Sequence, residues 1–139
     1  KRSNKGITLE TMHHFAEMTN RAGLVNHADF IIGLPGETSD TIRTTIKWAK
    51  KLKVDSYQFT IPKPYPGTPL YRYLETNGFL KNGWANYPFL SSEDIESWTK
   101  YALKETNMNP SYLIRMIGKP KEWRRLMRSA IHVLPNIIG

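Results

Sequence analysis

Cysteine is absent from the 139 residues of this sequence. Its absence excludes disulfides, a thiolate nucleophile, cysteine-ligated zinc and iron–sulfur ligation within these residues. The histidines do not compensate, because no two of them have a metal-binding spacing such as His-x-x-x-His; they are His13, His14, His27 and His132. We therefore expect no metal site in this sequence.

Long hydrophobic runs are also missing. No apolar stretch approaches the roughly 20 residues of a membrane span, and no signal-peptide pattern opens the sequence, which predicts a cytoplasmic protein.

Acidic residues are few: 12 Asp and Glu against 20 Lys and Arg give a formal net charge of +8. This excess favours an anionic partner, either nucleic acid, an acidic lipid surface or a small molecule that bears phosphate or carboxylate.

The stretch most typical of a site is Asp-Phe-Ile-Ile-Gly-Leu-Pro-Gly-Glu-Thr, residues 29–38. An apolar run here leads through a Gly-Leu-Pro-Gly turn to residues that start helices, so it predicts a strand over 24–32, a tight loop and a helix. Phe30, Ile31 and Ile32 do not alternate with polar residues, so both faces of the strand are expected to be covered, as in a parallel sheet. Such sheets bind ligands at the carboxyl ends of their strands.

A second strand is predicted over residues 55–61, where the sequence alternates. Bulky residues occupy one face (Tyr57, Phe59, Ile61) and polar residues the other (Ser56, Gln58, Thr60). We expect the bulky face to meet helices and the polar face to look into an interior cavity. The order helix, strand, helix, strand predicts that the two strands are parallel with a right-handed crossover.

Capping residues and glycines mark the expected helices. These helices start at Thr8, at Thr38 or Ser39, at Thr68, at Ser91 or Ser92, at Asn109 and near Pro120; Gly23, Gly78 and Gly118 end the first, third and fifth, and Pro135 follows the last. The first is expected to bury a stripe of Leu9, Met12, Phe15, Ala16 and Ala22. Residues 78–89 are expected to form a loop in which Trp84 and Tyr87 either cover a pocket or pack the loop itself.

Two parallel strands do not make a stable sheet, because their outer edges and apolar faces stay open. We infer that the sequence starts inside a larger α/β domain whose other strands precede Lys1. Alone, the chain is expected to borrow strands from a second copy or to stay partly disordered at its amino-terminal edge.

Three segments together resemble the radical S-adenosylmethionine (SAM) enzymes: Lys-Gly-Ile-Thr at 5–8, Phe-Ile-Ile-Gly-Leu-Pro-Gly-Glu-Thr at 30–38 and Pro-Tyr-Pro-Gly-Thr-Pro-Leu-Tyr at 64–71. The resemblance covers most of residues 5–117. It is strongest to the cobalamin-binding subgroup that includes the anaerobic magnesium-protoporphyrin monomethyl ester cyclase type, and residues 109–113 are similar to part of that subgroup's tail motif.

The resemblance implies an α/β fold: residues 1–80 would be the C-terminal part of a partial (β/α)6 TIM-like barrel, and 81–139 a helical tail. In the family, a three-cysteine motif holds a [4Fe-4S] cluster that binds SAM and cleaves it reductively. Because this sequence has no cysteine, the cluster and the cobalamin domain would lie in upstream sequence. The chain would line the pocket for SAM and a small-molecule substrate, with the N-terminal half of the same oxidoreductase or methyltransferase as its partner, and would be inactive alone.

The resemblance also implies cofactor-binding residues. Ile31 and Gly33 would lie near the adenine of SAM, and the backbone at Ile61 and Pro62 would complete the pocket, since glycine lets backbone approach a flat ring closely. Glu37 is a further candidate, although the family's glutamate falls one residue earlier and Asp29 stands where the family has glycine.

Other interpretations stay open. Residues 33–38 also fit a plain strand-to-helix turn with Glu37 near a helix amino terminus, and they lack the lysine of a phosphate-binding P-loop. His27 and Asp29 share a strand face and form either a structural polar pair or an acid–base pair. The basic terminal helix, with Arg124 and Arg128, allows a non-catalytic module that binds RNA, an acidic partner or an acidic membrane surface. A fragment of another (β/α) barrel enzyme is the remaining alternative.

Overall fold

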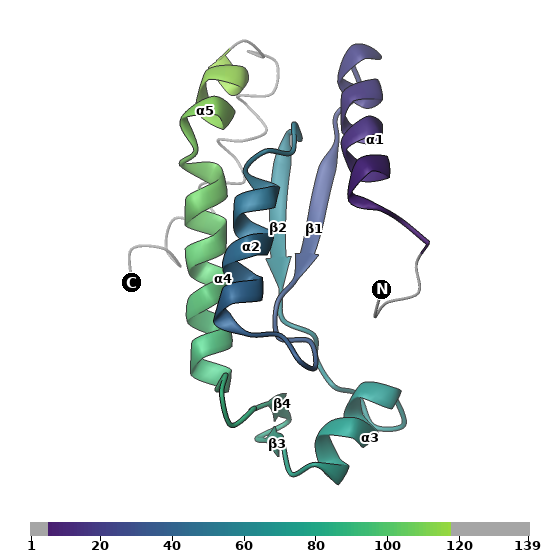
Figure 1. Ribbon diagram of the computed structural model, residues 1–139, viewed down its shortest axis with the longest axis vertical. Helices are drawn as coiled ribbons and strands as arrows, with labels where there is room; N and C mark the ends of the chain where they lie inside the picture. The colour runs from purple at the N-terminus through teal and green to yellow at the C-terminus, as the bar shows by residue number, and fades with distance from the viewer. Residues whose placement is uncertain (1–5, 118–139) are drawn as a thin grey trace.

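The computed structural model describes residues 6–117, which form a mixed α/β fold (Figure 1). The described helices are α1 (Leu9–Arg21), α2 (Ser39–Ala49), α3 (Pro69–Thr76), α4 (Ser92–Asn107) and α5 (Pro110–Ile117). The strands are β1 (His27–Ile31), β2 (Ser56–Thr60), β3 (Leu80–Lys81) and β4 (Trp84–Ala85). The helix predicted from Pro120 onward lies outside the described residues.

Strands β1 and β2 pair in parallel, as predicted, and α2 forms the crossover between them (Figure 1). The register places Ile31 opposite Thr60. The ladder extends one residue further, because the N–H group of Ile32 donates a hydrogen bond of 3.0 Å to the carbonyl oxygen of Thr60. The carboxyl ends of the two strands are therefore held side by side.

Helices α2 and α4 cover one face of this sheet. Tyr57 and Phe59 are buried on that face, which confirms the prediction that the bulky side of β2 meets helices. The expectation that β1 is covered on both faces is wrong for the described residues, since Ile31 is 43% exposed. We call the uncovered side the open face; it carries His27, Asp29, Ile31, Gln58 and Thr60. The sheet is one-sided because α2 and α4 pack on the same face and no other described element covers the opposite one.

A buried polar pair joins the amino ends of the two strands. The backbone N–H of Asn26 donates to Asp55 Oδ2 at 3.0 Å, and the backbone N–H of Asp55 donates to Asn26 Oδ1 at 2.8 Å. The side-chain amide of Asn26 also donates to Thr19 Oγ1 of α1 at 2.7 Å. Because all these groups satisfy one another away from water, the pair ties α1 to both strands.

Helix α1 begins after its predicted N-cap, Thr8, but its apolar stripe is not buried. Ala16 is buried, whereas Leu9 and Phe15 are 57% and 64% exposed. Besides Thr19, the helix contacts its neighbours through His13, whose ring lies edge-on to Trp48 of α2 at 5.6 Å, and through Asn20, whose side-chain amide donates to the carbonyl oxygen of Lys53 at 2.6 Å. Within residues 6–117 no element covers the outer side of α1, so this side presents apolar side chains to its surroundings.

The segment predicted as a loop after α3 contains a short hairpin, in which β3 pairs antiparallel with β4. Its turn residues, Asn82 and Gly83, have φ values of +51° and +79°. Asn-Gly is the dipeptide that a two-residue type I′ hairpin turn prefers, so the signal was present in the sequence.

Helix α3 and the hairpin lie beyond the carboxyl ends of β1 and β2 (Figure 1). The predicted boundary between residues 80 and 81 falls inside β3, and that division of the chain stays a prediction.

Candidate functional site at the carboxyl edge of the sheet

The loops that follow β1 and β2 leave the same edge of the sheet, and the hydrogen bond between Ile32 and Thr60 joins their starting points. The structure thereby brings the predicted residues Ile31 and Gly33 next to Ile61 and Pro62 in the fold. The side chain of Ile31 is on the open face, and Ile61 and Pro62 are half-buried. An exposed apolar side chain beside two half-buried ones, at the ends of adjacent parallel strands, suits a flat, largely apolar ligand group.

The carboxylate of Glu37 turns back onto its own loop. Its Oε2 atom accepts hydrogen bonds from the backbone N–H groups of Gly33 at 2.6 Å and Leu34 at 3.3 Å. Helix α2 has a different cap, Thr38, whose hydroxyl oxygen accepts from the N–H of Thr41. Glu37 thus fixes the shape of the loop, and the N–H group of Gly33 is already engaged by protein.

Gly33 is required by the packing of α4 as well as by its own backbone. Its φ of +100° lies in the region that side-chain-bearing residues avoid. A Cβ atom on Gly33 would lie 3.0 Å from Cγ2 and 3.2 Å from Cδ1 of Ile95. A side chain would therefore project toward α4. The glycine permits a close approach, as the sequence argument supposed, but the group that approaches is the side chain of Ile95.

Tyr87 supports the same loop from the other side. This residue is 3% exposed, and its hydroxyl group donates a hydrogen bond of 3.1 Å to the carbonyl oxygen of Gly33. The pKa of Tyr87 is raised to about 12, chiefly by burial and to a smaller extent by the nearby Tyr73 and Glu37. Tyr87 is accordingly a neutral donor at physiological pH. Of its two predicted roles, packing of the loop is the one the structure shows.

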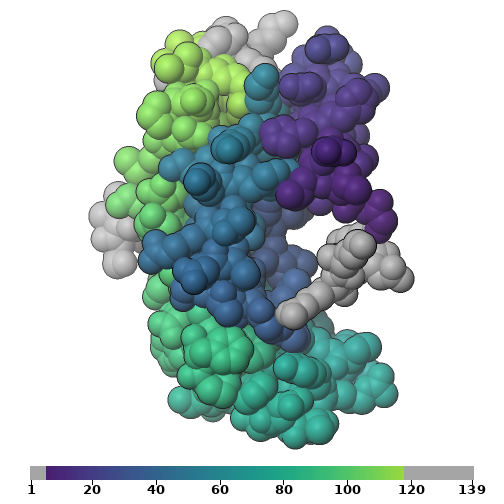
Figure 2. Space-filling model, in the orientation of Figure 1, coloured from purple at the N-terminus to yellow at the C-terminus, as the bar shows by residue number. Residues whose placement is uncertain are grey.

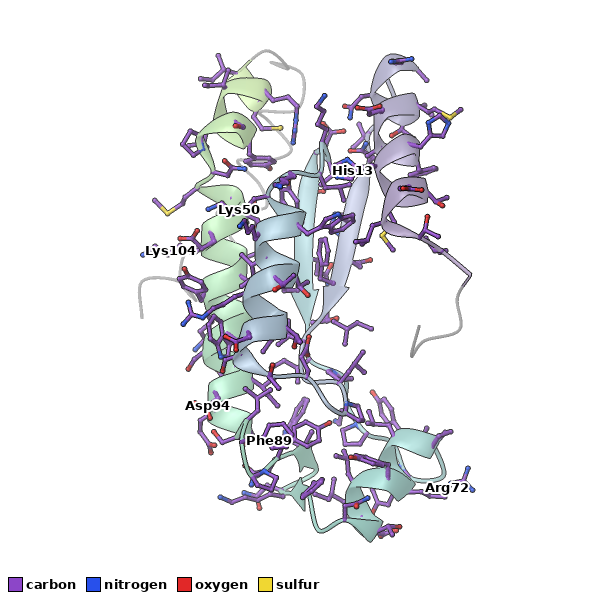
Figure 3. The ribbon with its side chains drawn as sticks, viewed as in Figure 1. His13, Lys50, Arg72, Phe89, Asp94 and Lys104 are labelled. Atoms are coloured by element: carbon purple, nitrogen blue, oxygen red, sulfur yellow. The ribbon has the colours of Figure 1, made fainter. Side chains whose placement is uncertain are left out.

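Exposed aromatic side chains and one cation form a rim beside this edge. The Nζ atom of Lys63 lies 5.7 Å from the ring centre of Tyr65 and 5.8 Å from that of Trp84. Both rings are exposed, at 60% and 40%, and so is Phe89, which is labelled in Figure 3 and whose ring stacks on that of Tyr87. Lys63 was not among the residues predicted from the sequence; its position in the proline-rich loop directly after β2 is the signal that would have identified it. The rim can contact an apolar group and an anionic group together.

A polar pair lies on the open face, as the sequence predicted. The Nε2 atom of His27 is 3.1 Å from Asp29 Oδ1, and its Nδ1 atom is 2.6 Å from Ser56 Oγ. Both ring nitrogens of His27 are therefore engaged, and the aspartate and serine side chains orient the ring. The pair is separate from the Gly33 loop, because His27 and Ser56 are at the amino ends of their strands.

The chain does not offer a ligand set for an iron–sulfur cluster. Its sequence holds no cysteine, and residues 6–117 contain no group of three His, Asp or Glu side chains placed to hold a metal ion. None of the described helices is both long enough and apolar enough to cross a membrane.

Comparison with known proteins relates the chain to several enzymes, although no family model matches it. It is 36% identical over 123 residues to an uncharacterized methyltransferase of Pyrococcus horikoshii, an alignment that covers 81% of this chain and 27% of the relative. It is 31% identical over 71 residues to the anaerobic magnesium-protoporphyrin IX monomethyl ester cyclase of Rubrivivax gelatinosus, covering 51% of this chain and 13% of the relative. A third relative is the tRNA-2-methylthio-N(6)-dimethylallyladenosine synthase of Vibrio campbellii. It is 33% identical over 79 residues, an alignment that covers 57% of this chain and 14% of the relative.

These relatives are members of the radical SAM family, so the resemblance predicted from the sequence is supported at that level. The chain spans less than a third of the length of each of them. The match to the cyclase subgroup is weaker, since the Rubrivivax gelatinosus cyclase aligns over only 71 residues and the corresponding cyclase of Cereibacter sphaeroides, which aligns over 136 residues, is only 24% identical.

Proposed function

We propose that this chain is the carboxyl-terminal part of a radical SAM enzyme, and that the edge formed by β1 and β2 is one wall of the SAM pocket. The observation that supports it most is the Ile32 to Thr60 hydrogen bond, which places the loop of Gly33 beside Ile61 and Pro62. In this proposal Ile31, Ile61 and Pro62 contact the adenine ring and exclude water from it. Glu37 acts indirectly, because it holds the loop.

The open face supports the same proposal. In a partial (β/α)6 barrel, helices cover the outer side of the strands and the inner side lines a cavity. The distribution of α2, α4 and the polar side chains on β1 and β2 is of this kind. Further strands from upstream sequence would pair with the outer ladder edges, and the N-terminal half of the same enzyme would then be the principal partner. The pair His27 and Asp29 would face the interior of this barrel.

The cofactors divide between the two halves in this proposal. Upstream cysteines would hold the [4Fe-4S] cluster, and the upstream sequence would also carry cobalamin if the protein belongs to the cyclase-like subgroup. SAM, once bound, is the source of the 5′-deoxyadenosyl radical in such enzymes. This chain's own contribution is to bind and orient the adenine and to shape the substrate side with the rim around Lys63. The complete protein would be an oxidative cyclase or a methyltransferase that acts on a small molecule.

The experiment measures SAM affinity in the complete protein with its cluster loaded. Ile31→Asp places a carboxylate in the proposed adenine contact, and we expect SAM to bind at least about tenfold more weakly, because a desolvated charge would face the purine. Val25→Asp is the matched control, since Val25 precedes the same strand at its opposite end and is 46% exposed against 43% for Ile31. Equal SAM affinity in both variants, at equal iron content, would contradict the proposed pocket.

A further inference from the structure

A basic groove lies on the outer side of the helical layer, away from the carboxyl edge of the sheet. It is a hollow of about 770 Å³ between α2, α4 and the start of α5. Its cationic lining residues are Arg43, Lys47, Lys50, Lys51, Lys53 and Arg115, and the one acidic side chain among its lining residues is Glu105. Figure 2 shows the surfaces of α2 and α4 adjoining on the face turned to the viewer. We call this hollow the basic groove.

The groove keeps most of its positive charge. Glu105 pairs with Lys50 at 2.6 Å, and Lys53 lies 3.7 Å from Glu17 of α1. Within the described residues no salt bridge is formed by Lys47 or Lys51, both on the α2 side of the groove. Because the cations lie close together and Glu105 neutralises only one of them, the groove has a local positive potential that attracts polyanions.

Arg115 adds a donor, its Nε atom, that has no acceptor within residues 6–117. Its guanidinium group lies 5.6 Å from the ring centre of Tyr112 and donates to the carbonyl oxygen of Val54. Its Nε atom is buried and has no hydrogen-bond partner in the part of the chain that the structure describes. A buried N–H without an acceptor is costly, and a ligand oxygen entering the groove could satisfy it.

Aromatic side chains extend the basic groove along α4. A smaller hollow of about 290 Å³ shares Arg43 and Tyr101 with it and is also lined by Trp98. The guanidinium of Arg43 lies over the ring of Trp98 at 4.7 Å, and Trp98 meets Tyr101 edge to face at 5.6 Å. Tyr101 is 44% exposed, so one side of its ring is open to a partner. The groove therefore combines clustered cations with an accessible aromatic ring.

We propose that the basic groove binds single-stranded nucleic acid, with its lysines and arginines on the phosphates and Tyr101 stacked on a base. Proteins that bind single strands use this combination of a cationic groove and stacking aromatics. A lipid bilayer fits less well, because a flat surface would touch only the rims of a concave site. Two of the three exposed aliphatic residues of α5, Leu113 and Ile117, also point elsewhere, since they lie roughly 160–240° around the helix from Ser111 and Arg115, which line the groove; Ile114 lies nearer, at roughly 60–100° from them. This binding does not depend on the proposed SAM pocket.

The test uses fluorescence anisotropy of a labelled oligouridine of about 12 nucleotides with the full chain. In Lys47→Glu combined with Lys51→Glu, we expect binding at low salt to weaken at least about tenfold. The plot of log affinity against log salt should also become shallower by about 1.4, since each lost phosphate contact of a single strand removes about 0.7. Tyr101→Ala should weaken binding about fivefold or more and leave the salt slope unchanged.

The control is Arg72→Glu combined with Lys81→Glu, which changes the net charge equally at exposed positions. Arg72 lies at the opposite end of the molecule from Lys50 (Figure 3). This control should retain most of the affinity. The proposal is overturned if both double variants lose affinity equally, or if uridine monophosphate binds as tightly as the oligonucleotide. It is also overturned if phosphatidylserine vesicles bind in a groove-dependent way and the oligonucleotide does not. Circular dichroism establishes that each variant is folded.

Discussion

The hydroxyl group of Tyr87 donates a hydrogen bond to the carbonyl oxygen of Gly33, 54 residues earlier in the chain. On its other side, Gly33 gives its N–H group to the carboxylate of Glu37. The loop after β1 is therefore fixed by one side chain from within the loop and one from the aromatic segment before α4. Because both backbone polar groups of Gly33 are engaged, ligand contacts at this edge should come chiefly from neighbouring side chains.

Gly33→Ala should destabilise the fold more than an ordinary glycine replacement in the left-handed region. The positive φ alone costs roughly 1–2 kcal/mol for an alanine, and the clash with Ile95 should add about 1–3 kcal/mol as overpacking. Gly67→Ala is the matched control, since Gly67 has a φ of +85° but no atom within 4 Å of the position of a Cβ. Urea unfolding of both variants measures the difference.

The clash can be separated from the backbone strain by a double-mutant cycle. In an Ile95→Ala background, Gly33→Ala should cost about as much free energy of unfolding as Gly67→Ala does in the original chain. An unchanged cost of Gly33→Ala in that background would show that contact with Ile95 does not explain the glycine.

Glu37→Ala should lower the free energy of unfolding by about 1–3 kcal/mol, because two backbone N–H groups lose a charged acceptor. Glu37→Gln keeps a neutral carbonyl acceptor and should cost less. Glu75→Ala, an exposed substitution on α3, is the control and should stay within about 0.5 kcal/mol. If all three variants unfold alike, the carboxylate does not hold the loop in solution.

Stability should depend on Tyr87 at alkaline pH. The pKa of Tyr87 is raised from 10.0 to about 12 in the folded chain, chiefly because burial disfavours the phenolate. Its stabilising contribution is complete below pH 10.0 and decreases as the pH rises toward about 12, since the unfolded chain loses the proton first. Urea titrations across this window should show the chain losing stability relative to Tyr87→Phe. A difference independent of pH would contradict the buried hydroxyl.

The amino ends of the strands offer a separate test of the fold. Asp55→Ala removes the acceptor of the buried Asn26 N–H and should cost about 2–3 kcal/mol in free energy of unfolding. Asp29→Ala removes a carboxylate whose side chain is 65% exposed and should cost less than about 1 kcal/mol. Similar losses in the two variants would mean that Asn26 and Asp55 do not join the strands.

Local signals in the sequence were sufficient for much of the fold. Thr8 and Thr68 were predicted as helix caps and Gly23 and Gly78 as helix ends, and all four predictions are confirmed. These features depend on a few neighbouring residues, so a single sequence contains them. The alternation in β2 likewise identified which side of the strand meets helices. Bulky and polar residues alternate there, and so do buried and more exposed side chains.

The contacts between distant segments were not predictable in the same way. The sequence offered no sign that Tyr87 would reach Gly33 or that Ile95 would fill the space beside it, since these partners are set by how α4 returns across the sheet. The stripe on α1 shows the converse. Its period predicts an apolar helix face, but period alone does not say whether the segment that would cover it is in the same chain. Asn82 and Gly83 were a local hairpin signal in a segment predicted only as a loop.

Hydrogen exchange of the complete, cluster-loaded protein, with and without SAM, tests the central claim most directly. The account predicts that SAM slows exchange in peptides covering residues 30–37 and 59–63, because the two loops at the carboxyl edge of the sheet contact the adenine. Peptides from α5, at the other end of the strands, should be unaffected. Full SAM binding with unchanged exchange in both loops would contradict the account.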